Sequence, residues 1–444
     1  MENKEVKANG WALIPALVFL VLYLGLGILF EYVLGIPMGF YNIPIVVAFM
    51  VAVLVACLQN KALSFDKKLS IMAAGVGDKD IMTMILIFLC AGVFVGVTGR
   101  DSAQAVAYVL LSVTPAWFAV AALFIVSCFV SLAMGTSCGT ISLIVPIAAA
   151  VAEASGYPVA FCVGSVMGGA MFGDNLSFIS DTTIAACNTQ GCKMKDKFNA
   201  NFKIALPAAV ITLVLIIVLS INSNVGQVEI LDYELVKLIP YILVLAGGLA
   251  GINVFVVLLV GIISGLIIFL ASGSVTFFEM LGNMGSGASG MYETIMVTIL
   301  VSALCGLIRA HGGFAALLNF IRKVFKGNKG GQLGMGLLVG AMDIATANNT
   351  VAIVMAGPIA KEMSEEYGIE PQRAASILDT FSCIFQGVIP YGAQMLLALA
   401  AAAECGYTLS AFEVIPNLYY PALLGVVSII YIALGKKQTE TKNK

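Results

Sequence analysis

The sequence predicts an all-α polytopic membrane protein of about 11–13 membrane segments, built as two inverted structural repeats with broken or re-entrant helices. The first reason is composition. Of 444 residues, 60% are hydrophobic and 11% are charged, and the mean hydropathy is +1.01. The second is that apolar runs close to the roughly 20 residues of a membrane-crossing helix recur from end to end. The third is an internal repeat. Together these features exclude a soluble protein and predict one integrated domain in the lipid bilayer.

Candidate spans fill both halves of the chain. Those of the first half are 11–34, 41–58, 81–98, 116–134, 139–154, 159–172 and 203–221. Those of the second half are 238–250, 253–271, 292–308, 314–325, 332–346, 350–364, 373–399 and 415–434. A short apolar piece at 103–113 and its counterpart near 314–325 would not cross a bilayer. We expect both to be interfacial or re-entrant segments.

The internal repeat relates the two halves at an offset of 212 residues. Pro146 lies ten residues before Gly156, and Pro358 lies ten residues before Gly368, so the offset is 368 − 156 = 212. Transporter folds are often built from such repeats. The sequence therefore divides into a first repeat at 1–221, a linker at 222–236 and a second, inverted repeat at 237–444.

Loop charges predict that the repeats are inverted, because cytoplasmic loops carry an excess of Lys and Arg. Basic loops at 59–79, 187–203 and 309–330 are expected in the cytoplasm. Loops at 222–236, 272–290 and 400–415, which lack this excess, are expected outside. Lysines near both ends of the chain place both termini in the cytoplasm.

Several function classes are excluded by what the sequence lacks. Ten cysteines are scattered mostly within apolar runs and the chain has a single histidine, so neither a zinc site nor a disulfide framework is expected. Neither a phosphate-binding loop nor a nucleophile–base set is visible. We therefore expect neither an enzyme nor an organic cofactor. The net charge of −2 gives no basis for binding nucleic acid.

The densest group of oxygen-bearing side chains is the segment Gly173-Asp174-Asn175-Leu176-Ser177-Phe178-Ile179-Ser180-Asp181-Thr182-Thr183. A carboxylate near the bilayer centre costs roughly 2.5–3.5 kcal/mol on insertion scales, so these acids must face protein or water. Carboxylate, amide and hydroxyl oxygens suit hard cations. We predict Na⁺ at Asp174 and Asp181, with ion or proton ligands also at Asn175, Ser177, Ser180 and Thr182. The alternative is that Asp174 or Ser180 only caps the next helix.

Two further helix breaks fall at matched positions in the halves. Their polar residues are Thr136, Ser137 and Thr140 in the first half and Asn348, Asn349 and Thr350 in the second. Broken helices at the midplane form the substrate sites of inverted-repeat transporters. The alternative is helix packing through small residues, with hydroxyls bonded back to the preceding turn.

The second half also contributes embedded acids and neutral polar residues. Asp343 and Asp379 are candidate proton carriers, because a cation arriving at a buried acid displaces its proton. Asp379 could instead line a vestibule. Gln386, Tyr391 and Gln394 are candidates to complete a cavity opposite Asp174 and Asp181 or to hydrogen-bond a solute.

At the segment 173–183 the sequence resembles the NhaC-type sodium/proton antiporters, whose signature is Gly-Asp-x-x-Ser-x-x-Ser-Asp-Thr-Thr. All seven fixed positions match. The resemblance implies a scaffold domain and a moving transport domain, commonly in a homodimer, in the cytoplasmic (inner) membrane of a prokaryote. It implies exchange of Na⁺ for H⁺ by alternating access, with these two as coupling ions. The alternative is Na⁺- or H⁺-coupled transport of a small organic solute, an amino acid or organic acid.

Overall fold

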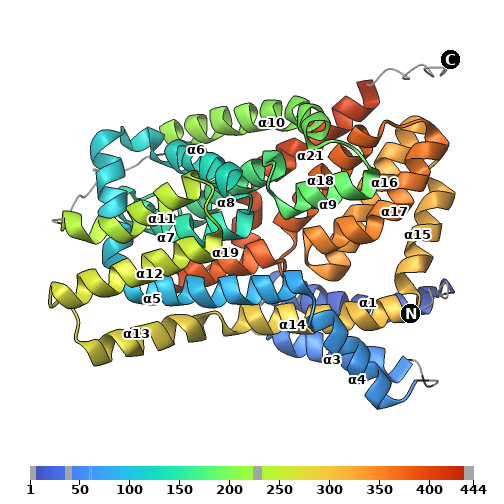
Figure 1. Ribbon diagram of the computed structural model, residues 1–444, viewed down its shortest axis with the longest axis horizontal. Helices are drawn as coiled ribbons and strands as arrows, with labels where there is room; N and C mark the ends of the chain where they lie inside the picture. Colours follow the sequence, from blue (N-terminus) through green and yellow to red (C-terminus); the bar gives the residue numbers. More distant parts are fainter. Residues whose placement is uncertain (1–6, 36–42, 60, 62, 224–232, 435–444) are drawn as a thin grey trace.

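The computed structural model describes residues 7–35, 43–59, 61, 63–223 and 233–434, and regular structure within these ranges is helical throughout. Many helices run along the long axis of the molecule (Figure 1). Nine helices of the described ranges are long and apolar enough to cross a membrane, or up to ten if the bent pair Ala411–Asn417 and Tyr419–Leu434 is one span. Ile45–Gln59 and Leu235–Leu249 are shorter apolar helices. The prediction of an all-α, multi-pass membrane protein is confirmed.

The first half begins with a helical segment that contains α1 (Ile14–Leu20) and α2 (Leu26–Ile28). It continues with α3 (Ile45–Gln59), α4 (Phe65–Val76), α5 (Lys79–Val113), α6 (Ala116–Met134), α7 (Ser137–Ser155), α8 (Val159–Leu176), α9 (Asp181–Gln190) and α10 (Met194–Asn222). The second half comprises α11 (Ile239–Leu249), α12 (Val254–Ala271), α13 (Phe277–Gly290), α14 (Tyr292–Ala310), α15 (Gly313–Val324), α16 (Gly327–Thr346), α17 (Asn349–Tyr367), α18 (Pro371–Val388), α19 (Ala393–Glu404), α20 (Ala411–Val414) and α21 (Tyr419–Leu434).

The helix bounds repeat at the offset of 212 residues. α7 and α17 both have 19 residues, start from an N-cap side chain (Thr136 or Asn348) and end at a left-handed glycine (Gly156 or Gly368). α8 and α18 both have 18 residues and both end in extended backbone. The internal repeat inferred from sequence is therefore visible in the order and length of the helices.

Several segments expected to be loops contain helix. α4 lies within 59–79, α13 within 272–290 and α15 within 309–330. α10 begins at Met194, not near 203, so the expected basic loop 187–203 is largely helical. The start of α13, a helix whose later half is rich in Gly and Ser, is fixed by a capping box in which Thr276 and Glu279 exchange hydrogen bonds. The expected linker 222–236 falls mostly outside the described residues.

The short piece at 103–113 is a separate arm of α5. The helix bends at Gly99, whose φ of 59° and ψ of −167° are not helical, and the arm turns away from the longer part (Figure 1). α14 and α15 meet in a similar way at Gly312, with φ +81°. The bends lie 312 − 99 = 213 residues apart, close to the repeat offset. The placement of these arms relative to a membrane stays a prediction.

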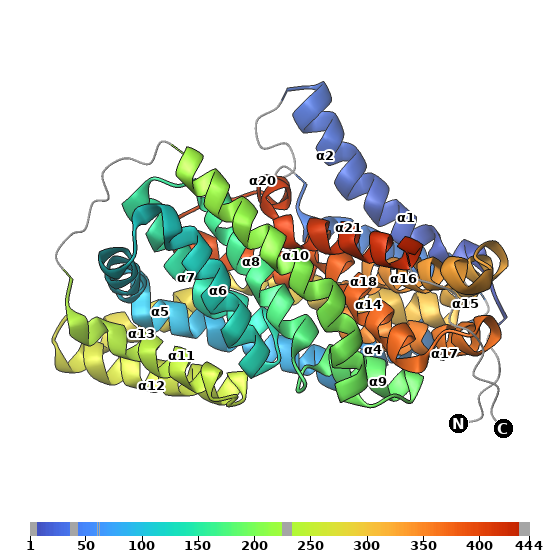
Figure 2. The same ribbon diagram turned by 90° about the horizontal axis from the view of Figure 1, so that it is seen from above.

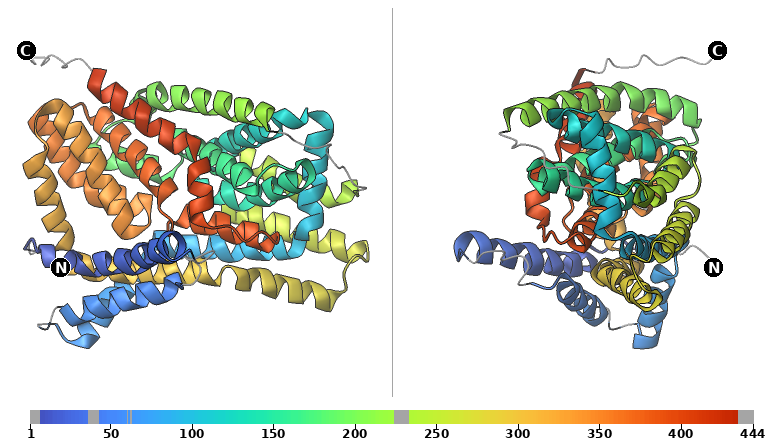
Figure 3. Two further views of the ribbon diagram at one scale, coloured as in Figure 1. Left: turned by 180° about the vertical axis from the view of Figure 1, so that it is seen from behind. Right: turned by 90° about the vertical axis from the view of Figure 1, so that its left-hand side faces the viewer.

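The two halves contact one another reciprocally. α9 packs on α17 while α19 packs on α7, and α4 packs on α14 while α13 packs on α5. Contacts exchanged in this way indicate a pseudo-twofold relation between the halves. Within each half a three-helix core is formed by α6, α7 and α8 or by α16, α17 and α18. The helical segment around α1 and α2 stands out from this body (Figures 2 and 3).

Backbones approach closely where the halves meet. A Cβ atom on Gly92 of α5 would lie 2.2 Å from the carbonyl oxygen of Gly287 in α13. A Cβ atom on Gly75 of α4 would lie 2.7 Å from the carbonyl oxygen of Ser302 in α14. Gly75 and Gly287 are equivalent in the repeat, since 287 − 75 = 212. The same position thus provides the close approach on both sides of the pseudo-twofold axis.

Candidate ion-binding site

α8 and α9 are joined by an extended segment at 177–180, which interrupts the predicted ion motif. Ser177 is 1% exposed, and its hydroxyl accepts a hydrogen bond from the backbone two residues later at 3.3 Å. This contact holds the turn. The helix is therefore broken between Asp174 and Asp181. On an unbroken helix, which rises 1.5 Å per residue, a separation of seven residues would place the two acids too far apart to share one ion.

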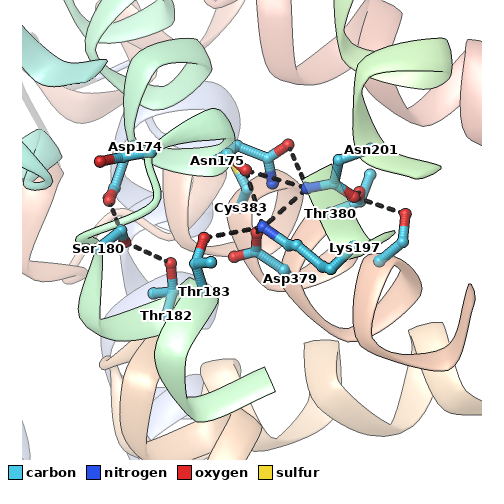
Figure 4. A network of polar contacts seen from close by, with 12 residues as sticks. Asp174, Asn175, Ser180, Thr182, Thr183, Lys197, Asn201, Asp379, Thr380 and Cys383 are labelled. Carbon is cyan, nitrogen blue, oxygen red and sulfur yellow. Dashed lines mark hydrogen bonds and ion pairs between the residues drawn. The ribbon is translucent and has the colours of Figure 1, made fainter. Parts of the chain in front are cut away.

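Asp174, in the last turn of α8, is the centre of a hydrogen-bond network. Its Oδ2 accepts from Ser137 Oγ at 2.7 Å and from the Ser137 backbone N–H at 3.2 Å. Its Oδ1 accepts from Ser180 Oγ at 2.6 Å (Figure 4). Ser180 also shares a hydrogen bond of 2.8 Å with Thr182 Oγ1. Gln394 Nε2, from α19, donates to Ser137 Oγ at 2.6 Å, so the network joins the two halves.

Two helix starts lie beside Asp174. Ser137 is the first residue of α7, and Ser180 is the N-cap residue of α9. A helix N-terminus carries a positive partial charge that favours a nearby carboxylate. Asp174 does accept a hydrogen bond at a helix start, but this is the start of α7 and not that of α9, the next helix. The Ser180 hydroxyl donates to Asp174. Capping of the next helix therefore does not account for these two residues.

Asp181 is not brought together with Asp174. It is exposed at the first position of α9, where the helix N-terminus favours a negative charge. Thr182, the next residue, is buried and faces the Asp174 network. One Na⁺ held by both carboxylates is not the arrangement that this structure contains. Asp174 is the buried acid of the motif.

Asn175 leads from the α8 break to a second network (Figure 4). Asn201 Nδ2 donates to both the backbone oxygen and Oδ1 of Asn175, at 3.0 Å each. Lys197 Nζ donates to the Asn175 backbone oxygen at 2.9 Å and to Thr183 Oγ1 at 2.8 Å. Lys197 also forms an ion pair with Asp379 of α18, in which the side chains are 1% and 2% exposed. This pair ties α10 in the first half to α18 in the second.

Asp379 does not line a vestibule, so that alternative is wrong. The residue is 1% exposed, and Asn201 Nδ2 lies 3.2 Å from its Oδ2. Ser376 and Thr380, on the same face of α18, donate to Asn201 Oδ1. A buried ion pair is favourable only when further hydrogen bonds satisfy its partners. The amide and hydroxyl groups around Lys197 and Asp379 provide them.

The sequence interpretation missed Lys197 and Asn201. Lys197 was counted among the basic residues of a cytoplasmic loop, yet it is 1% exposed inside a helix. The spacing of Lys197 and Asn201 could have indicated them, since residues four apart lie on the same face of a helix. The pair also stands immediately ahead of the apolar run that begins at 203.

The matched breaks before α7 and α17 have a local structural role. Asn348 and Thr136 each accept a hydrogen bond from a backbone N–H of the first helical turn, at 2.9 and 3.4 Å. Asn349 Oδ1 accepts from the N–H of Thr350 at 3.0 Å. The Thr140 hydroxyl bonds back to the Thr136 carbonyl at 3.0 Å, as the packing alternative expects. Ser137 is the residue of these breaks that contacts Asp174.

Gln386 and Tyr391 bind the carboxyl end of α16. Gln386 Nε2 donates to the carbonyl of Ala347 at 3.1 Å, and the Tyr391 hydroxyl donates to the carbonyl of Ile344 at 2.6 Å. Asp343 lies in the same turn and is 0% exposed. Neither of its carboxylate oxygens has a hydrogen-bond partner in the part of the chain that the structure describes. Asp343, Gln386 and Tyr391 thus gather at one helix end.

A cavity of about 420 Å³ lies between α4 and α14 and reaches Ile81, Ser302 and Thr346. These three residues also line a smaller pocket that extends to Asn348 and Tyr391. The second helix break therefore lies beside a small pocket that shares part of its lining with the larger cavity between the two halves.

Comparison with known proteins identifies the family. The profile of the Na⁺/H⁺ antiporter family matches residues 4–221 and 222–436. The chain belongs to the Na⁺/H⁺ antiporter family. It is therefore a membrane antiporter rather than an enzyme, and Na⁺ and H⁺ are the coupling ions of its family.

Relatives of this antiporter differ in their cargo. The malate-2H⁺/Na⁺-lactate antiporter of Bacillus subtilis is 25% identical over 454 residues, covering 94% of this chain and 95% of the relative. The Na⁺/H⁺ antiporter NhaC of the same organism is 25% identical over 382 residues, covering 76% and 82%. The crystal structure of the Alcanivorax borkumensis YdaH transporter matches with a TM-score of 0.41 and 14% identity, covering 81% of this chain and 90% of that chain.

Proposed function

We propose that this antiporter exchanges Na⁺ for H⁺ by alternating access, with Asp174 as the carboxylate that holds the two ions in turn. The observation that carries the proposal is the set of partners around Asp174. Within the described residues, its hydrogen bonds come from two hydroxyl groups and one backbone N–H. The buried Asp379, by contrast, is neutralised by Lys197. Asp174 is left to be neutralised by a proton or a cation.

Hydroxyl partners suit a site that changes its occupant. A Ser or Thr hydroxyl can donate to a carboxylate, or turn and offer a lone pair to a cation. Ser137, Ser180 and Thr182 all lie in the Asp174 network. A proton and Na⁺ would compete for the same Asp174 oxygens, so binding of one favours release of the other. That competition is the chemical basis of exchange.

The position of Asp174 between the halves supports alternating access. Gln394 of the second half reaches its network through Ser137, and the Lys197–Asp379 pair joins the halves next to Asn175. Rocking of one repeat against the other would change these contacts and hence the side from which Asp174 is reached. We place the protein in the cytoplasmic membrane of a prokaryote, with both termini inside and as a homodimer.

The test is transport by Asp174→Asn in proteoliposomes that contain a pH-sensitive dye. We expect Na⁺-driven proton movement to fall to the background of empty liposomes, because an amide neither binds the proton nor attracts the cation. Asp181→Asn is the matched control and should retain most of the exchange, since Asp181 is exposed. Unchanged Na⁺ affinity and pH profile in Asp174→Asn would overturn the proposal.

A second control separates Asp174 from the single histidine of the chain. His311 lies between α14 and α15, and burial together with the nearby positive charge of Lys68 lowers its pKa. Its neutral form is therefore favoured. His311→Gln should leave the pH profile of transport unchanged.

Exchange of an organic solute is the second candidate. It is supported by the match to a malate/lactate antiporter over 94% of this chain. Asn348 and Tyr391, which line the small pocket next to the cavity, are the candidates to hydrogen-bond such a solute. The same proteoliposomes distinguish the candidates when malate, lactate or an amino acid is added. Proton movement with Na⁺ alone supports the first, and a strict requirement for the solute supports the second.

A further inference from the structure

We propose that Asp343 forms a second binding site for a monovalent cation of the size of Na⁺, in the second half of the chain and separate from Asp174. This goes beyond the exchange proposed above, which needs one cation site in each chain. The site consists of the Asp343 carboxylate and the side-chain oxygen of Gln386, at the carboxyl end of α16.

The first argument is the isolation of the Asp343 carboxylate. The residue is 0% exposed, and both carboxylate oxygens are buried without a hydrogen-bond partner among the described residues. A buried charge without a partner is strongly unfavourable, so such a group must take up a proton or a cation. Asp174 and Asp379 both have donors in this structure, which sets Asp343 apart.

The second argument is that oxygen acceptors surround this turn. Ala347 adopts a left-handed conformation with φ 49°, and its N–H donates to the Asp343 backbone oxygen at 2.7 Å. The Ala347 carbonyl takes the amide N–H of Gln386. Gln386 Oε1 is then left buried without a partner in the described part of the chain. The N–H donor of the Gln386 amide is already used, so what remains here is the Asp343 carboxylate and an amide oxygen. Such oxygens suit a hard cation rather than an anion.

The third argument comes from the other repeat. Asp343 is equivalent to Ser131, since 343 − 131 = 212, and the Ser131 hydroxyl simply donates to the Ala170 carbonyl at 2.6 Å. The fold therefore does not need an acid at this position. Gln386 is equivalent to Asp174, since 386 − 174 = 212. Each half thus has one acid in this pair of positions. In the first half the acid is Asp174 on α8, and in the second half it is Asp343 on α16.

The fourth argument is the cavity that reaches the end of α16. Thr346, three residues after Asp343, lines the cavity of about 420 Å³ between α4 and α14. Cys305, on the wall of this cavity, donates to the carbonyl of Ala345 in the same turn. The end of α16, three residues from the buried Asp343, therefore forms part of the cavity wall.

The experiment counts sodium ions. Equilibrium binding of ²²Na⁺ is measured on the purified full-length chain in detergent, at alkaline pH and saturating Na⁺. We expect two ions per chain in the unaltered protein and one in Asp343→Asn. Asp343→Ser, which introduces the residue of the other repeat, should also bind one. It guards against a folding defect in the first variant, and thermal unfolding of both variants is recorded alongside.

The outcomes separate this second site from the proposed role of Asp174 in exchange. One ion per chain in the unaltered protein, retained in both Asp343 variants, would overturn the second site and leave Asp174 as the exchange site. Loss of one ion in the Asp343 variants, together with normal Na⁺ binding and exchange in Asp174→Asn, would support the Asp343 site and overturn the proposed role of Asp174. Loss of one ion in each single variant supports both.

Discussion

The three buried acids of this antiporter differ in what meets their carboxylate oxygens. Asp174 accepts hydrogen bonds from hydroxyl groups and from the start of a helix, and Asp379 forms an ion pair with Lys197. Asp343 has no hydrogen-bond partner among the described residues. The motif alone predicted that Asp174 is embedded, because its neighbours are apolar or small. Sequence could not show that Asp181 turns outward or that Lys197 turns inward, since both depend on how α9 and α10 pack against the second half.

The Lys197–Asp379 pair leads to a stability prediction. Lys197→Met should lower the free energy of unfolding by about 3–5 kcal/mol, because it leaves the buried Asp379 charge without its partner. The double variant Lys197→Met/Asp379→Leu should be less destabilised than Lys197→Met, since it removes both charges. Thermal unfolding in detergent gives the comparison, with Lys195→Met at an exposed position as the control. A Lys197→Met protein as stable as the control would mean that the pair contributes little.

At the scale of the helices, the two repeats end α6 and α16 in the same left-handed conformation with different residues. Gly135 ends α6 with φ 69°, and Ala347 ends α16 with φ 49°. These positions are 347 − 135 = 212 residues apart. The sequence predicted both breaks from the small polar residues that follow. It did not predict the helical form of α4 and α13, because short helices with glycine or charge resemble loops in sequence until neighbouring helices cover their apolar face.

These helix ends predict opposite effects of two substitutions. Ala347→Gly should raise the free energy of unfolding by about 1 kcal/mol, because a left-handed alanine is strained and glycine is not. Gly135→Ala should lower it, since the new Cβ would also lie 2.7 Å from the Ile179 side chain and 3.0 Å from the Ser180 backbone nitrogen. That crowding would displace Ser180 from Asp174, so Gly135→Ala should also weaken Na⁺-driven exchange. Thermal unfolding and the proteoliposome assay measure the two effects, and equal stability of both variants would contradict the strain argument.

At the scale of the whole molecule, reciprocal packing of the halves and the position of the basic turns agree with an inverted repeat. The turn between α12 and α13 lies at one end of the long axis (Figure 1). The basic turn between α15 and α16 lies toward the other end (Figure 1). Loop charge predicts which side of the membrane each turn faces, because sidedness follows from topology and does not depend on side-chain packing, and this assignment stays a prediction.

Labelling of single cysteines tests the inverted arrangement. Lys61 and Ser274 occupy nearly equivalent turns, since 274 − 61 = 213, and both are exposed. In an inverted repeat these turns face opposite sides of the membrane, whereas in a parallel repeat they face the same side. On a cysteine-free background that still transports, we expect a membrane-impermeant maleimide added to intact cells to label Ser274→Cys. Lys61→Cys and Lys329→Cys should react only after the membrane is permeabilised, because basic turns are retained in the cytoplasm. Labelling of Lys61→Cys and Ser274→Cys from the same side would contradict the inverted repeat, and with it the alternating-access scheme in which Asp174 is reached from each side in turn.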